Sequence, residues 1–154
     1  VEVSSDPQSL ERIRSFVESA CRELISPPLS DEQTQKMIVA AREVGSSIIH
    51  HAYHGRTDGT IRLEAEATPD RLTIRLWHRG ENFDPGLVGE PLRDGSRAGR
   101  FGVYMASQYT GKVQYFSDGQ GVHCLSLITD RAANAATNTA PESGPPGNYR
   151  ETEE

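Results

Sequence analysis

A carboxylate, a hydroxyl and three imidazoles recur at helical spacing within residues 37–55. At about 100° per residue, the following side chains fall within about 100° of arc: Glu43, Ser47, His50, His51 and His54. A glutamate on such a face could act as a general base. Two imidazoles one turn apart could instead bind Zn²⁺, although the HExxH order of zinc proteases is absent. The segment therefore predicts a helix in which one face carries a carboxylate, a hydroxyl and three imidazoles.

The neighbouring side of the same segment is apolar and predicts a packed face. Its members are Met37, Ala41, Val44, Ile48 and Ala52. Ser30 and Gln33 form a capping box at one end, and Gly55 is a natural C-terminal stop. We therefore expect a central helix over 31–54. An ordinary amphipathic helix with a solvated polar face is the alternative interpretation.

Length, composition and charge limit the class of protein to which this helix can belong. The chain has 154 residues, of which 35% are hydrophobic and 25% charged, which fits one compact domain. A formal net charge of -6 argues against binding to nucleic acid or to anionic lipid. No apolar run approaches the roughly 18 residues of a membrane span. We expect a cytoplasmic protein with protein or small-molecule partners.

The first thirty residues predict a short strand followed by a packing helix. Val1–Val3 is strand-like, Asp6 and Pro7 suit a helix start, and Pro27 ends the periodic apolar pattern. The two cysteines lie in apolar positions of predicted elements, so buried free thiols are expected rather than a disulfide: Cys21 and Cys124.

Four further stretches have the composition of strands. Residues 60–67 and 71–77 alternate between apolar and polar side chains and are joined by a turn, which predicts a hairpin. Residues 112–116 and 122–128 predict a second pair of strands, which an Asp-Gly turn connects. A sheet of four or five strands is therefore expected.

The remaining segments are a long connection, a short helix and a polar tail. Residues 78–98 are rich in Gly, Pro, Asp and Arg without periodicity, which predicts a mobile lid over a site. Residues 101–109 suit a helix. Residues 130–154 hold almost no large apolar side chains, so we expect a disordered tail after a domain over 1–129.

These segments, in this order, resemble the ATP-binding domain of RsbW-like anti-sigma-factor serine kinases, within the GHKL ATPase superfamily. The central-helix pattern E-x-x-x-N-x-x-x-H-A-Y is matched by Glu43, Ser47, His51, Ala52 and Tyr53. The pattern D-x-G-x-G-F-D-P is matched by Gly80, Phe83, Asp84 and Pro85. A glycine-rich segment entering a helix is matched by Gly99 and Gly102. The resemblance covers about residues 1–129.

The resemblance implies an α+β fold of the GHKL (Bergerat) type. This fold is a two-layer α/β sandwich, with a mixed, mostly antiparallel sheet covered by helices on one face. The site would then lie between the central helix and the lid.

The resemblance also implies roles for individual residues. Glu43 stands at the position of the general base, and Ser47 stands where the family has a Mg²⁺-binding asparagine. His78 replaces the aspartate that accepts a hydrogen bond from adenine, so protonation of this histidine should weaken nucleotide binding as the pH falls. The remaining nucleotide-site positions are His51, Gly80, Asn82, Gly99, Arg100 and Gly102.

The resemblance implies that the protein would be a bacterial anti-sigma regulatory switch and a homodimer. It would bind a STAS-type anti-sigma-factor antagonist, a sigma factor, or both. An active member would use ATP and Mg²⁺ to phosphorylate a serine or threonine of the antagonist. The alternative is a catalytically inactive GHKL-fold binding module, because Ser47 and His78 depart from the family pattern.

Overall fold

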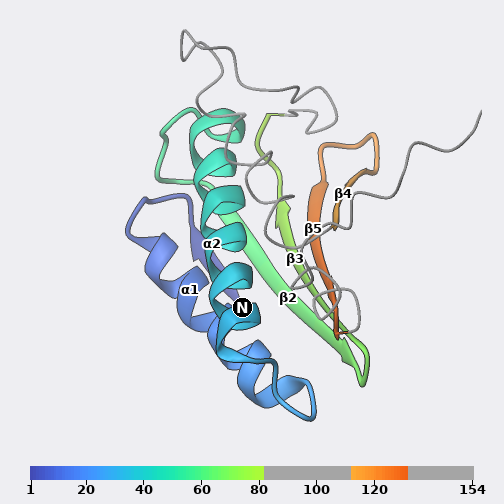
Figure 1. Cartoon of the computed structure of the whole chain (residues 1–154). Helices are drawn as coiled ribbons and strands as arrows, with labels where there is room; N and C mark the ends of the chain where they lie inside the picture. Colours follow the sequence, from blue (N-terminus) through green and yellow to red (C-terminus); the bar gives the residue numbers. More distant parts are fainter. Residues whose placement is uncertain (82–111, 132–154) are drawn as a thin grey trace, which may run out of the picture.

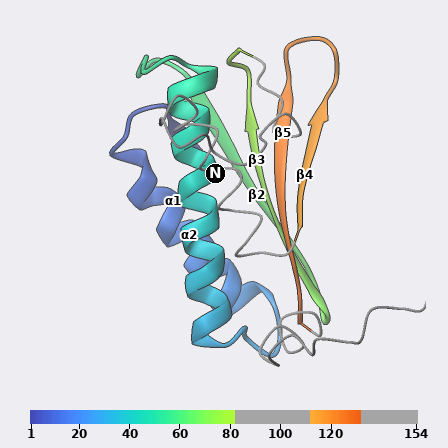
Figure 2. The ribbon, with the colours of Figure 1, turned by 45° about the horizontal axis from the view of Figure 1, so that its top comes forward.

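The computed structural model describes residues 1–81 and 112–131, which form one antiparallel sheet with helices on one face (Figures 1 and 2). The elements are β1 (Glu2–Ser4), α1 (Ser9–Ser19), the π-helix η1 (Ala20–Leu24), α2 (Asp31–Ser47), the π-helix η2 (Ile48–Ala52), β2 (Thr60–Thr68), β3 (Arg71–His78), β4 (Lys112–Ser117) and β5 (His123–Asp130). The strand order is β1-β2-β3-β5-β4. Every pairing in the described sheet is antiparallel.

The core lies between the sheet and the two helices. The alternation along the strands turns one set of apolar side chains toward α1 and α2: Ile61, Leu63, Leu72, Ile74, Leu76, Leu125 and Leu127. The predicted apolar stripe of the central helix is buried against them, including Met37, Val44 and Ile48. The expected α+β, two-layer sandwich is therefore confirmed.

The first helix begins later than the sequence suggested. Asp6 and Pro7 form a turn in which the Asp6 carboxylate accepts a hydrogen bond from the Gln8 N–H at 2.8 Å, and α1 starts at Ser9. The carboxylate therefore stabilises the turn before the helix rather than capping the helix itself. The chain widens into η1 after Ser19. Cys21 and Cys124 are both buried and free, as expected.

The central helix matches its predicted start and differs near its end. The Ser30 hydroxyl accepts from the Gln33 N–H at 3.1 Å, and the Gln33 side chain accepts from the Ser30 N–H at 3.2 Å. From Ile48 onward the helix widens into the π-turn η2. His54 and Gly55 then adopt left-handed backbone angles, which end the helix.

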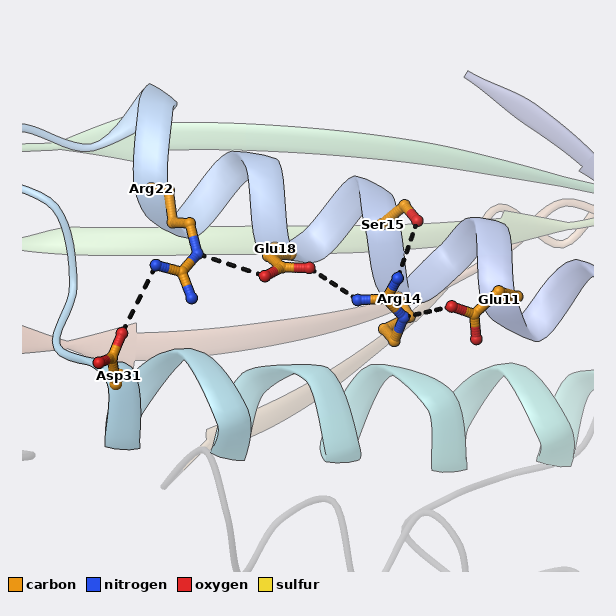
Figure 3. A network of polar contacts seen from close by, with 6 residues as sticks. All are labelled: Glu11, Arg14, Ser15, Glu18, Arg22 and Asp31. Atoms are coloured by element: carbon orange, nitrogen blue, oxygen red, sulfur yellow. Dashed lines mark hydrogen bonds and ion pairs between the residues drawn. The ribbon is translucent and has the colours of Figure 1, made fainter.

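A chain of ion pairs runs along α1 and η1 and reaches the start of α2 (Figure 3). Arg14 contacts Glu11 and lies 2.7 Å from Glu18, and Arg22 lies 3.4 Å from Glu18 and 3.5 Å from Asp31. These groups are solvent-accessible, so each pair contributes little to stability. This series of ion pairs nevertheless links η1 to the first turn of α2.

The four main predicted strands are all present as β2 to β5. β2, β3 and β4 each end one residue later than expected, β5 begins one residue later and ends two residues later, and the predicted first strand is β1. The lid beyond residue 81, the helix over 101–109 and the tail after residue 131 lie outside the described residues. Within the part of the chain that the structure describes, no helix has the length and apolar character to cross a membrane.

Candidate functional site

The described part of the site lies where η2, the start of β2 and the end of β3 meet. Tyr53 joins them, since its hydroxyl donates to the Thr60 carbonyl at 2.6 Å and accepts from the Arg79 N–H at 3.0 Å. The Glu81 N–H donates to the Ala52 carbonyl at 2.6 Å. These bonds fix the residues after β3 against the end of the central helix.

Gly80 is required by this close approach. A Cβ atom at this position would lie 2.5 Å from the Ala52 carbonyl oxygen and 2.8 Å from the Ala52 Cβ. Both are atoms of a helix end that cannot move aside easily. The glycine of the second sequence motif therefore has a packing reason that is visible in the structure.

Glu43 and Ser47 lie one turn apart on α2 but differ in exposure. Glu43 is half-buried, whereas Ser47 is 2% exposed and its hydroxyl donates to the Glu43 backbone carbonyl at 3.0 Å. This bond turns the short Ser47 side chain back onto its own helix. Mg²⁺ requires well-placed oxygen ligands at about 2.1 Å. The described residues therefore do not fit a Mg²⁺ site of the expected kind at Ser47.

His78 is buried within a group of aromatic rings. Its side chain is 2% exposed. Its ring centroid lies 5.1 Å from that of His123 and 6.2 Å from that of Tyr53. Tyr115 stacks on His123 and its hydroxyl lies 3.2 Å from His123 Nδ1. Burial, and secondarily the nearby His123, lower the pKa of His78 from 6.5 to about 4.

The lowered pKa corrects one expectation from the sequence. A histidine whose pKa lies at about 4 stays neutral between about pH 6 and pH 8. Protonation of His78 therefore cannot weaken nucleotide binding across that interval. The sequence suggested otherwise because a motif position does not show how deeply its side chain is buried.

The histidines of the central helix do not share one exposed face. His50 is exposed, His51 is half-buried, and His54 lies beyond the helix, where its ring contacts Glu81. The π-turn at Ile48 changes the angle between successive residues, so the arc computed for a regular α-helix does not hold past this point. Within residues 1–81 and 112–131, no three His, Cys, Asp or Glu side chains are grouped to bind a metal ion.

Four of the expected site residues cannot be placed. Asn82, Gly99, Arg100 and Gly102 lie outside the described residues. Conversely, His123 lies beside His78 and was not expected in the site. Only the register of β3 with β5, which sets these two residues opposite each other, brings them together.

A cavity of about 390 Å³ lies at the end of β3 that carries His78. It is lined by Glu2, Thr60, Arg62, Trp77, His78, Arg79 and Val122. Most of this wall comes from the sheet face opposite the helices, where the Arg62 guanidinium lies 5.1 Å from the centre of the Trp77 ring. It is therefore not the cleft expected between the central helix and the lid.

Comparison with known proteins defines the class to which this fold and site belong. The profile of the histidine kinase-like ATPase domain (HATPase_c_2) matches residues 3–129. The chain belongs to this family of histidine kinase-like ATPase domains. The resemblance drawn from the three motifs is thereby confirmed at the level of the family and its GHKL fold.

The similar proteins include named regulators. The chain is 26% identical over 112 residues to "Serine-protein kinase RsbW" of Listeria innocua, covering 66% of this chain and 71% of that protein. The RsbW protein of Listeria monocytogenes serotype 4b gives the same identity and coverage. "Anti-sigma F factor" of Clostridium beijerinckii is 37% identical over 57 residues, covering 37% of this chain and 39% of that protein.

A solved structure is similar at the level of the backbone. The histidine kinase domain of the blue-light-activated histidine kinase EL346 of Erythrobacter litoralis superposes with a TM-score of 0.48 at 17% identity. The match covers 79% of this chain and 63% of that chain, so this chain spans less than two thirds of that protein domain.

Proposed function

We propose that this chain is an anti-sigma regulatory protein that acts by binding protein partners. The partners would be a STAS-type anti-sigma-factor antagonist, a sigma factor, or both. The names of its similar proteins, RsbW and anti-sigma F factor, support the role. So does the match to the histidine kinase-like ATPase domain over residues 3–129.

One structural contrast favours partner binding over phosphate transfer. The packing frame of the site is intact, because Gly80 fits against Ala52 and Tyr53 bridges Thr60 to Arg79. Where the resembled family has an asparagine that binds Mg²⁺ and an aspartate that contacts adenine, this chain has Ser47 and His78. A fold that is kept while its ligand-binding side chains change suits a protein whose surface carries the function.

Phosphorylation of the antagonist is the second candidate, and Glu43 favours it. Its carboxylate is half-exposed at the position of the general base and could accept the proton of an attacking serine or threonine hydroxyl. ATP would supply the phosphoryl group, and the nucleotide would also contact His51, Asn82, Gly99, Arg100 and Gly102. Because Ser47 does not fit the metal, we derive no transfer step through Mg²⁺.

Three further expectations belong to the same proposal. Residues 1–129 would form the histidine kinase-like ATPase domain, followed by a disordered polar tail over 130–154. The protein would act as a homodimer in the bacterial cytoplasm. Each expectation comes from the family resemblance or from composition.

The proposal is tested by measuring partner binding and phosphate transfer on the same proteins. The purified chain is titrated with STAS-type antagonists and sigma factors of the source organism, and is then incubated with radiolabelled ATP. We expect one of these proteins to bind, with affinity nearly unchanged in Glu43→Ala and Ser47→Asn, and no label transferred. Transfer that Glu43→Ala abolishes would establish the second candidate. Binding to neither class of partner would overturn the anti-sigma role.

A further inference from the structure

The cavity at the end of β3 lies on the outer face of the sheet, which is the face turned away from α1 and α2 (Figure 1). Ile61 and His78 are paired across β2 and β3, and both are buried on the helix side. Their neighbours along the strands therefore direct their side chains to the outer face. Four of these neighbours line the cavity: Thr60, Arg62, Trp77 and Arg79. Glu2 lines it from β1, and the chain before Glu2 runs past Leu63, away from the cavity.

Trp77 forms an apolar wall of this outer-face cavity, and its ring is held in place by three neighbours. The indole Nε1–H donates to the Glu64 carboxylate at 2.8 Å, and the Phe116 ring packs edge-on with its centroid 6.2 Å away. The Arg62 guanidinium lies 5.1 Å from the centre of the Trp77 ring. Val122 adds a second apolar side chain to the lining. A wall that is fixed before a ligand arrives reduces the entropy that binding costs.

The cavity offers one available charge of each sign. Arg62 already pairs with Glu64 at 3.3 Å, so its charge is balanced within the protein. Arg79 and Glu2 are the other charged residues of the lining, and both are exposed. Within residues 1–81 and 112–131, neither of them forms an ion pair. Asp118, in the turn between β4 and β5, uses its carboxylate to accept two backbone N–H groups of that turn, at 2.7 Å and 3.0 Å.

These charges and the cavity volume limit the class of ligand. A simple anion would be attracted by Arg79 but repelled by Glu2, and a simple cation would meet the reverse arrangement. A nucleotide carries several negative charges and would meet only one unpaired guanidinium. A zwitterion satisfies both groups at once. The volume of about 390 Å³ lies near the lower end of the range for small-molecule sites, which suits a ligand the size of an amino acid.

We propose that the outer-face cavity binds a small zwitterion with an apolar body, of the chemical class of an aromatic amino acid. Arg79 would bind its carboxylate and Glu2 its ammonium group. Its apolar body would pack against Trp77 and Val122. The cavity lies on the sheet face opposite α2, which carries Glu43, so this inference does not depend on the proposed function.

The test uses the fluorescence of Trp77, which is the only tryptophan of the chain. The full chain is titrated with phenylalanine, which is not excited with tryptophan. We expect a saturable change in emission with a Kd of about 1 mM, the order expected for a ligand of this size. Phenethylamine lacks the carboxylate and phenylpropanoate lacks the ammonium group, so each should bind at least about tenfold more weakly.

Three results of this titration would overturn the proposal. The first is the absence of saturation with phenylalanine at about twenty times the expected Kd. The second is binding of phenethylamine or phenylpropanoate as tight as that of phenylalanine. The third is an emission change that appears without any ligand as the protein concentration rises, since a second copy of the chain would then cover Trp77.

Two variants and one control locate the bound phenylalanine. Arg79→Gln and Glu2→Gln should each raise its Kd about tenfold, because each removes the partner of one ligand charge. Arg12→Gln removes another exposed guanidinium, on α1 in the helix layer, and should leave the Kd unchanged. All three side chains are exposed, so the fold should persist. Equal effects of Arg79→Gln and Arg12→Gln, or no effect of Glu2→Gln, would contradict the assigned site.

Discussion

At the scale of single residues, the burial of His78 makes stability depend on pH. Its pKa is about 4 in the folded protein, against 6.5 for an unperturbed histidine. Between these values the unfolded state binds more protons than the folded state, so the free energy of unfolding falls as the pH falls. From about pH 7.5 to about pH 5, His78 should cost about 2 kcal/mol of stability.

Urea unfolding of the wild type and of His78→Gln, each measured at about pH 7.5 and at about pH 5, isolates the contribution of His78 to the pH dependence of stability. Glutamine does not titrate, and the other histidines contribute equally to both proteins, so the variant should lose less stability on acidification. An equal loss in the two proteins would show that His78 does not titrate below the usual histidine range.

Gly80 offers a second test at the same scale. Gly80→Ala places a methyl group within 3 Å of the Ala52 carbonyl and side chain, so the end of η2 must shift. We expect a loss of about 1–3 kcal/mol in the free energy of unfolding. Gly119→Asn is the matched control, because a side chain there meets open space and Asn tolerates the left-handed backbone. A loss at Gly119 as large as that at Gly80 would refute the packing explanation.

At the scale of elements, Tyr53 connects η2, β2 and β3. Tyr53→Phe removes the hydroxyl and leaves the Arg79 N–H and the Thr60 carbonyl without their side-chain partner. We expect a destabilisation of about 1–3 kcal/mol in chemical denaturation. Hydrogen exchange at the Arg79 and Glu81 amides should also accelerate, since both lie at this junction. Unchanged exchange at these two amides would mean that Tyr53 does not fix the end of β3.

The elements with clear periodicity were predictable from sequence. Strict alternation in residues 60–67 gave β2, and the Ser30–Gln33 capping box gave the start of α2. The apolar stripe of α2 also faces the core as expected. These signals are local, because each depends on the spacing of neighbouring side chains.

The chemistry of the site was less predictable because it depends on helix irregularity, on burial and on strand register, which residue spacing alone does not show. A helical wheel cannot anticipate the π-turn at Ile48, within which His50 is exposed and His51 half-buried, or that His54 lies beyond the helix end. It also cannot show that Ser47 is buried and bonded to the Glu43 carbonyl. The neighbour of His78 across the sheet, His123, is set by strand register. The motifs identified the family, whereas burial and register determined what the side chains can do.

At the scale of the whole molecule, the intact frame and the altered ligand side chains favour binding over catalysis. Glu43, Ser47 and His78 are assigned to the site by the motif resemblance, and in the structure Ser47 is turned onto its helix and His78 is a buried neutral imidazole. Restoring both side chains should restore nucleotide affinity, because asparagine offers Mg²⁺ a longer amide ligand and aspartate accepts a hydrogen bond from adenine.

Calorimetric titration with ATP and Mg²⁺ tests this conclusion most directly. The wild-type chain is compared with the double variant Ser47→Asn/His78→Asp, and circular dichroism checks that both are folded. We predict that the double variant binds Mg-ATP at least about tenfold more tightly than wild type, a difference of about 1.4 kcal/mol. Wild-type binding as tight as that of the double variant, and dependent on Mg²⁺, would contradict the proposal that Ser47 and His78 weaken the nucleotide site.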